Sequence, residues 1–239
     1  MSARSGTTGL IWLAIVMIAV SIATSAMGLF MDSWRVDDED ERDSDEASGS
    51  WGLTSLSYDC SVIDDDDEEE WCKVMMIFMA EGVEDAQDKY DEADDIPSKG
   101  SMDASEMCDN MEELAILFDD DMDDETKDDC EDTASAGETG STILWIGFGV
   151  ASISLILCMI SAISRDSISR IVGGVTGLSG GLLMGLSVLV WSQMLPNGIG
   201  GEDNDWNAGL NFYLTLVGGL LYLLLFDLQG KRLFYMVRC

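Results

Sequence analysis

Four long stretches of the chain contain no Asp, Glu, Lys or Arg, namely residues 5–31, 139–164, 171–201 and 206–226. An α-helix needs roughly 20 mostly apolar residues to cross the hydrocarbon core of a bilayer. Each of the four stretches reaches that length, so the sequence predicts a polytopic membrane protein with four spans.

We expect the chain to form a single polytopic domain, residues 1–239. Its spans are joined by one very long segment, two short connections and a tail. The predicted transmembrane helices are 8–31, 141–164, 171–195 and 207–228, and the other parts are an acidic extracellular segment 32–140, a short extracellular loop 196–206 and a cytoplasmic tail 229–239.

Charge is distributed very unevenly between these parts. Residues 32–140 hold 41 of the 46 acidic residues and 6 of the 12 basic ones, a net charge of −35, and the rest of the chain sums to +1. Lys and Arg beside a span favour the cytoplasmic side of the membrane. We therefore expect both termini in the cytoplasm and residues 32–140 outside. The basic residues that set this orientation are Arg4, Arg165, Arg170, Lys231, Arg232 and Arg238.

A cleaved signal peptide is the alternative for the first stretch. Arg4 provides a basic start, and Thr24-Ser25-Ala26 is a passable cleavage site. The apolar run is longer than the roughly 7–15 residues of a signal core, which favours a retained span.

Four of the six cysteines fall in the predicted extracellular segment, where oxidation to disulfides is expected. Four cysteines allow three pairings. We expect Cys60–Cys72 and Cys108–Cys130, because the ends of short local loops are the easiest to join.

Glycine recurs every four residues along the third span, at Gly173, Gly177, Gly181 and Gly185, and a pair follows in the fourth span, Gly218 and Gly219. Small residues let the backbones of neighbouring helices approach closely. This glycine ridge predicts tight packing within one helix bundle or, alternatively, a face for a partner. Five tryptophans lie near span ends, as an aromatic belt would place them: Trp12, Trp34, Trp145, Trp191 and Trp206.

The chain contains no histidine, the commonest metal ligand and general base near neutral pH. It shows no phosphate-binding, nucleophile-elbow or metalloprotease motif. We therefore expect no catalytic residue, no metal site and no cofactor, and the chain is not expected to be an enzyme.

The acid runs at 64–70 and 119–121 do not fit a helix–loop–helix calcium site. Such a loop needs Gly at its sixth position and Glu at its twelfth, and a loop starting at Asp64 or at Asp119 has neither. We expect weak, diffuse cation binding and no nucleic-acid partner. Because molar salt shortens charge repulsion to about 3 Å, the composition favours a salt-living or marine microbe.

The sequence pattern predicts part of the secondary structure of the acidic segment. Apolar residues alternate from Trp51 to Val62 with one slip between Leu53 and Leu56, as in a single strand with a bulge. Residues 71–80 fit a second strand or the start of a helix. Residues 101–132 are expected to be helical at their centre, with Met107, Met111, Leu114 and Phe118 on one face. Residues 37–48 and 121–140 are expected to be partly a disordered tether.

Several residues form an ordered set of short motifs. Trp34-Arg35-Val36 follows the first span, and Gly52-Leu53, Cys60 and Cys72-Lys73-Val74 come next. This set resembles the claudins, whose first extracellular segment is marked by a Trp, a Gly-Leu-Trp and two cysteines. Two later segments are also similar to claudins: the end of span three, from Gly181-Leu182-Leu183 through Val190-Trp191, and Gly218-Gly219-Leu220-Leu221 in span four. Thr54 departs from the pattern, because the second Trp of the family would stand there.

The resemblance implies an all-α membrane protein, with a left-handed four-helix transmembrane bundle and a small extracellular antiparallel β-sheet. Residues 34–74 would form the sheet, with Cys60–Cys72 joining two strands, and 75–140 would be a helical acidic insertion. It implies a multi-pass protein of the cell membrane with a structural, adhesive or lateral-assembly role. Its partners would be the lipid bilayer and either itself or another membrane protein. The alternative role is an accessory subunit that docks on a larger membrane complex through the glycine ridge.

The predicted topology is open to a labelling test. Reporter cysteines near Gly49 and Asn204 should react with a membrane-impermeant thiol reagent added outside the cell, whereas reporters near Ser167 and Gln229 should not. Labelling from outside at Ser167 would contradict the four-span arrangement.

Overall fold

A computed structural model describes residues 4–31, 33–37, 48–61, 72, 75–79, 98–110, 124–164, 167–196, 198–199, 206–221 and 224. The chain divides into two compact units. The helical unit comprises Met1–Phe30, Thr139–Val190 and Asn211–Cys239. The sheet unit comprises Met31–Glu138 and Trp191–Leu210.

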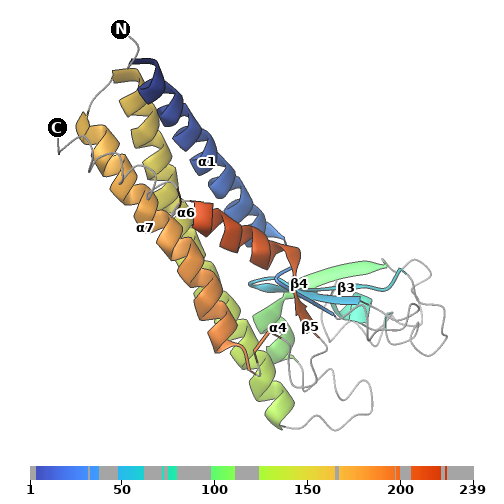
Figure 1. The fold of residues 1–239 in the computed structure, drawn as a ribbon. Coiled ribbons are helices and arrows are strands. Elements are labelled where there is room, and N and C mark those ends of the chain that lie inside the picture. The colour runs from blue at the N-terminus through green and yellow to red at the C-terminus, as the bar shows by residue number, and fades with distance from the viewer. Residues whose placement is uncertain are drawn as a thin grey trace. The chain divides into compact units, whose positions relative to one another are not determined.

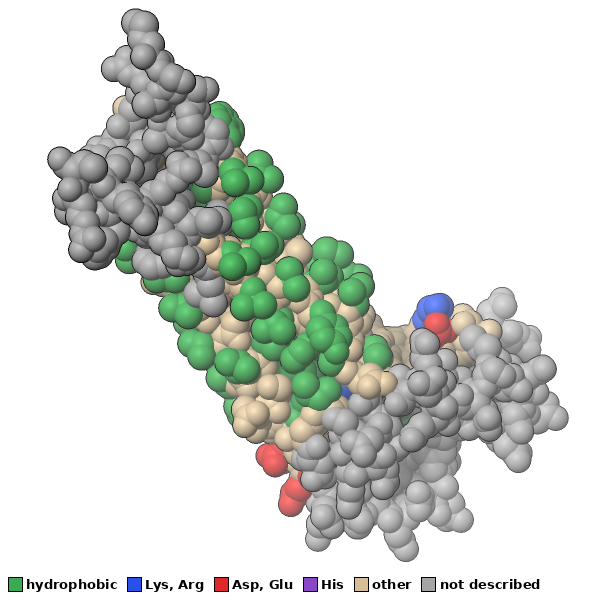
Figure 2. All heavy atoms as spheres, viewed as in Figure 1, with side chains coloured by type: hydrophobic (Ala, Val, Ile, Leu, Met, Phe, Trp, Pro, Cys, Tyr) green, Lys and Arg blue, Asp and Glu red, His purple; other side chains and the backbone are tan. Residues whose placement is uncertain are grey.

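Three helices are long and apolar enough to cross a membrane, which indicates a membrane protein. They are α1 (Arg4–Phe30), α6 (Asp124–Ser164) and α7 (Ser167–Met194). A shorter apolar helix spans Leu210–Leu221, within the fourth predicted stretch. Hydrophobic side chains cover the visible face of the helices, as a lipid-facing surface requires (Figure 2).

The end of α7 follows from its sequence. Pro196 comes two residues after the last helical residue, Met194, and cannot donate a backbone hydrogen bond to continue the helix. Gly198 then adopts a φ of 76°, a conformation that favours glycine, and its N–H donates to the Leu195 carbonyl over 3.2 Å. The chain thereby turns out of the helix towards the last strand.

Helices α6 and α7 approach each other closely through small residues. A Cβ added at Gly180 would lie 3.0 Å from the Ala151 nitrogen, and one at Gly173 would lie 3.2 Å from the Cys158 sulfur. The Ser154 hydroxyl also donates to the Gly173 carbonyl over 2.7 Å. The contact between α6 and α7 therefore uses Gly173 and Gly180, which are two helical turns apart. Gly180 was not part of the predicted ridge.

The segment Leu210–Leu221 packs against two other helices through its glycine pair. A Cβ at Gly218 would lie 2.7 Å from the Thr24 hydroxyl oxygen of α1. A Cβ at Gly219 would lie 3.1 Å from the Gly181 carbonyl oxygen and 3.1 Å from the Gly185 nitrogen, both in α7. Gly177 is buried on the same face of α7. Gly173, Gly181 and Gly185 of the ridge thus lie against helices of the same chain, although a Cβ added at Gly185 itself would have nothing within 4 Å.

The sheet unit contains a five-stranded antiparallel sheet with the order β4-β3-β2-β1-β5. Figure 1 shows the strands gathered beside the short helix α4 (Ala104–Asp109). The last strand comes from the segment after α7, far along the chain from the others. The strands are β1 (Arg35–Asp37), β2 (Ser48–Trp51), β3 (Ser55–Asp59), β4 (Lys99–Asp103) and β5 (Trp206–Ala208).

Two expectations about this segment were wrong. The predicted single bulged strand is two strands, β2 and β3, because the slip in its alternation is a turn in which the Gly52 N–H donates to the Ser55 carbonyl over 2.7 Å. Within 101–132, residues 101–103 belong to β4, and 111–123, the centre that was expected to be helical, lie outside the described residues. Residues 124–140 are not a tether, because α6 already begins at Asp124.

The remaining expectations for this segment have mixed outcomes. Residues 75–79 are helical, which decides between the two alternatives for 71–80. Met107 lies in α4, whereas Met111, Leu114 and Phe118 lie outside the described residues. The sheet draws β4 from the part of the chain that was assigned to the insertion, so the division at residue 75 does not separate two structures.

The turn between β2 and β3 rests on the backbone of α6. A Cβ added at Gly137 would lie 1.6 Å from the Leu53 carbonyl oxygen and 2.8 Å from its carbon, so only glycine fits there without a backbone shift. Gly149, in the same helix, has nothing within 4 Å of an added Cβ. Gly137 and Gly149 therefore allow a matched comparison, because both lie in α6 and only Gly137 lacks space for a methyl group.

Replacing each glycine by alanine should give opposite results. Gly137→Ala should lower the free energy of unfolding by about 3 kcal/mol or more, because a fixed backbone carbonyl blocks the new methyl group. Gly149→Ala should be neutral or stabilise by up to about 1 kcal/mol, since alanine is the better helix former. Thermal unfolding of the detergent-solubilised protein measures both. Equal, small effects at the two positions would contradict the packing of Leu53 on α6.

Candidate functional site

Trp34 links the two segments that build the sheet. Its N–H donates to the Trp51 carbonyl over 2.8 Å, and its carbonyl accepts from the Gly209 N–H over 2.8 Å. One residue therefore joins β2 on one side to the start of the last apolar helix on the other. Arg35 and Val36 continue this pairing in β1, opposite Ala208 and Asn207.

The Trp34 side chain is fully buried. Its ring packs edge-on against the ring of Trp191, with centroids 5.2 Å apart and an interplanar angle of 69°. Such aromatic pairs contribute about 0.5–1.5 kcal/mol beyond the area they bury. The expectation that both tryptophans anchor the chain at a lipid interface was wrong, because both rings are covered by protein. Trp12 and Trp145 are exposed, as the belt predicted.

Two disulfides brace the sheet unit, and they join the cysteines that were paired from the sequence. Cys60 bonds to Cys72, and Cys108 bonds to Cys130. The first bridge connects the end of β3 to a helical residue, so the implied bridge between two strands was wrong. The second ties α4 to the first turns of α6. Cross-links of this kind stabilise mainly by restricting the unfolded chain.

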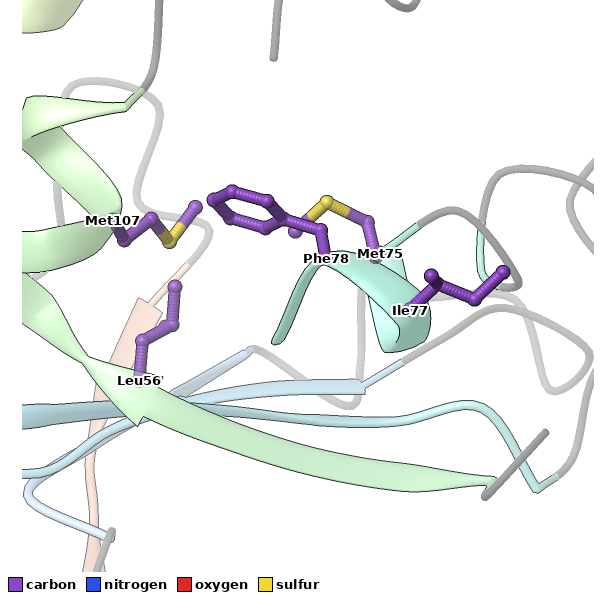
Figure 3. Close-up of a cluster of buried hydrophobic side chains, with 5 residues drawn as sticks. All are labelled: Leu56, Met75, Ile77, Phe78 and Met107. Carbon is purple, nitrogen blue, oxygen red and sulfur yellow. The ribbon is translucent and has the colours of Figure 1, made fainter. Parts of the chain in front are cut away.

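A methionine-rich core lies against one side of the sheet. Its buried members come from β3, from α4 and from the helical residues 75–79. Figure 3 shows the Phe78 ring between the side chains of Met107 and Met75. Each fully buried side chain of this size contributes roughly 1.5–3 kcal/mol. The cluster consists of Leu56, Met75, Ile77, Phe78 and Met107, with Trp51, Tyr58, Met79 and Met102 packed against it.

Lys99 on β4 forms an ion pair with Asp59 on β3. Partial burial would raise the pKa of Asp59, but hydrogen bonds from Lys99 and Ser61 outweigh it, so this pKa lies below its ordinary value of 3.8. The stabilisation by the pair is complete above that ordinary value and is lost as the pH falls through the lowered pKa. The contribution is small, because both side chains are partly exposed.

A groove of about 470 Å³ lies between α4 and the start of α6. Its lining contains four carboxylates and no basic residue. Asp103 already has a structural role, since its side chain caps α4 by accepting from the Ser105 N–H over 2.9 Å. The described residues contain no group of three or more Asp, Glu, Cys or His arranged to hold a metal ion. The four carboxylates belong to Asp103, Asp109, Glu131 and Glu138.

The residues of the claudin-like motif are thus brought together in part. Trp34, Arg35 and Val36 lie beside the Gly52-Leu53 turn in one sheet, and Cys60 and Cys72 are bonded. Lys73 and Val74 lie outside the described residues. Sequence reasoning missed β4 and β5. The alternation of polar and apolar residues in Ser101-Met102-Asp103 was a usable signal for β4, whereas three residues of β5 gave none.

Comparison with known proteins gives no family assignment. No protein-family model matches the chain, and no curated protein matches it.

Breaking the second bridge should loosen the sheet unit. The double variant Cys108→Ala/Cys130→Ala should lower the free energy of unfolding by about 2–5 kcal/mol, because the unfolded chain regains the freedom that the bridge removed. Thermal unfolding in detergent measures the loss. Cys158→Ala is the control, since Cys158 is free, and it should cost clearly less. Peptide mapping that joins Cys60 to Cys108 or to Cys130 would contradict the pairing.

Proposed function

We propose that the chain is a claudin-like, multi-pass protein of the cell membrane that assembles with copies of itself through its extracellular sheet unit. In this proposal the helical unit is a left-handed four-helix transmembrane bundle, and the role is structural or adhesive without catalysis. The observation that carries the proposal is the pairing of β1 with β5, which makes one sheet from two segments that follow different apolar helices.

The β1–β5 pairing bears on sidedness. β1 follows α1, and β5 follows α7, so the ends of these two helices lead into the same sheet. If each apolar helix crosses the bilayer, the segments 32–123 and 195–209 lie on one side, and Arg4, Arg165 and Arg170 lie on the other. The basic residues near the helix ends favour the cytoplasm for that second side. The disulfides of the sheet unit agree with an oxidising exterior.

The accessory-subunit alternative depends on the glycine ridge as a free docking face. Gly173 packs against Cys158, and the backbones of Gly181 and Gly185 pack against Gly219, all within the chain. This packing favours self-assembly through the sheet unit over docking through the ridge.

Salt should control the assembly. Two copies bring together segments that each carry a net charge of −35. Charge repulsion reaches about 8 Å in 0.15 M salt and about 3 Å in molar salt. We therefore propose an environment rich in salt, in which the acidic surface is screened and the copies can associate.

Co-purification of two tagged copies tests the proposed function. Chains carrying different affinity tags are expressed together, extracted in mild detergent and captured through one tag. We expect the second tag to be captured in molar potassium chloride and less of it at 0.15 M, because screening relieves the repulsion. Choline chloride is the control and should act like potassium chloride if the effect is screening. Absence of the second tag at every salt concentration, or a stoichiometric foreign subunit in its place, would contradict self-assembly.

A further inference from the structure

Methionine side chains gather on one face of the sheet in the sheet unit. Thioether sulfur is polarizable, so methionine serves two purposes in proteins: it fills irregular gaps in a core, and it binds soft metal ions. The contacts of each side chain distinguish these uses. Between residues 48 and 110, the described methionines are Met75, Met76, Met79, Met102 and Met107.

Two of these methionines fill the core. Figure 3 shows the side chains of Met75 and Met107 beside the ring of Phe78. Both methionines are buried members of the cluster that also contains Leu56. Contacts between a thioether and an aromatic ring are common in protein interiors, so packing alone accounts for these two residues.

Met76 and Met79 are arranged differently. They stand three residues apart in the helical residues 75–79, and side chains at that spacing are neighbours on a helix surface. A Cβ added at Gly100 of β4 would lie 2.9 Å from the Met76 Sδ and 3.0 Å from the Met79 Sδ. The two sulfurs are therefore separated by no more than the sum of these two distances. Both converge on one point over the β4 backbone, and glycine leaves that point open.

The first disulfide ties the segment that carries these sulfurs to the sheet. Cys72 lies four residues before Met76 and is bonded to Cys60 at the end of β3. The Cys60 N–H in turn donates to the Ser98 carbonyl, just before β4, over 2.8 Å. The bridge and this hydrogen bond thus hold the methionine segment next to the β3–β4 pair.

A third thioether lies on the same face of β4. Met102 is two residues from Gly100, and residues two apart in a strand point to the same face. Met102 is half-buried and packs against the methionine-rich core. Met79 is also half-buried, so this group of sulfurs is not sealed from the surface.

The donor set selects the kind of ion. The four cysteines of the sheet unit are in disulfides, and the chain contains no histidine. Thioethers are therefore the soft donors that the described part of this unit offers, and they favour Cu(I) over the hard cations that carboxylates hold. The expectation of no metal site came from histidine and carboxylate patterns, and it did not consider thioethers.

We propose that Met76 and Met79 bind one Cu(I) ion over Gly100, with Met102 as the third thioether ligand. This site is a further function of the sheet unit and does not depend on self-assembly.

A Cu(I) titration of the full chain in detergent tests for the site. The chain carries Cys158→Ala and Cys239→Ala, so that no thiol outside the two bridges can bind metal, and it competes with the chelator ferrozine for Cu(I) kept reduced by ascorbate. We expect one Cu(I) per chain in molar potassium nitrate, because salt screens diffuse attraction to carboxylates. The affinity should not change from about pH 5 to 8, since a thioether has no proton to lose. Loss of binding in molar salt, or affinity that rises with pH, would overturn the thioether site.

Leucine variants test the ligands. Met76→Leu and Met79→Leu should each weaken Cu(I) binding about tenfold or more, since even changes to groups that support a metal's ligands cost about 10–100-fold. Leucine conserves the volume of methionine, so the fold should be kept. Met107→Leu is the matched control and should leave the affinity unchanged. Equal affinities in the three variants, or oxygen neighbours of copper by X-ray absorption in place of sulfur, would contradict the assignment.

Gly100→Ala tests the placement while it keeps every sulfur. The added methyl group would meet both sulfurs, and flexible side chains can move away from it. Thermal unfolding should therefore change little, whereas the Cu(I) affinity should fall about tenfold, as it does when ligands lose their orientation. Unchanged affinity would overturn the position over Gly100. Because binding is measured on single chains, failure of the tagged copies to co-purify would leave this site standing, and failure to bind Cu(I) would leave self-assembly standing.

Discussion

Trp34 joins the two parts of the sheet through its backbone, and the rest of the sheet unit depends on that junction. Its N–H and its carbonyl are both used, towards Trp51 and towards Gly209. A buried backbone group without a partner costs free energy comparable to a lost hydrogen bond, so the segment after α7 cannot leave β1 without exposing or orphaning these groups. The buried ring pair of Trp34 and Trp191 covers the same junction. A short strand of three residues, β5, is thereby held in a sheet that it could not form alone.

In both units, glycines allow neighbouring backbones to approach each other closely. In the sheet unit, a Cβ at Gly209 would lie 2.2 Å from the Ser33 carbonyl oxygen, as one at Gly137 would meet Leu53. In the helical unit, glycines of α7 and of Leu210–Leu221 bring their backbones together in the same way. In lipid there is no hydrophobic force between apolar helices, and contact area gained by small residues is what holds them together. These close contacts are possible because glycine has no side chain, so the packing depends on glycine at these positions.

The sequence predicted those parts of the fold that local chemistry determines. Uninterrupted apolar length predicted α1, α6 and α7, and the closure of short loops predicted both disulfides. It could not predict what depends on contacts distant in the chain. The slip after Leu53 looked like a bulge because alternation does not distinguish a bulge from a tight turn. Residues 124–140 looked like a tether because they are rich in acid, and no local pattern reveals that Gly137 lets the backbone of their helix contact Leu53. Trp34 and Trp191 looked like interface anchors because both lie near span ends. Their burial depends on a contact between them that is distant in the chain.

The pairing of β1 with β5 is the central claim, and a designed disulfide tests it most directly. Val36 and Asn207 lie opposite each other in the sheet. The double variant Val36→Cys/Asn207→Cys should form a bridge within one chain on mild oxidation, so that the fragments stay together after proteolysis between Cys72 and Cys108, outside both native bridges, until a reductant is added. Val36→Cys with a cysteine in place of Gln229, on the predicted cytoplasmic side, should not. Failure of the first pair to bridge, or equal bridging of the second, would show that the two segments do not share a sheet.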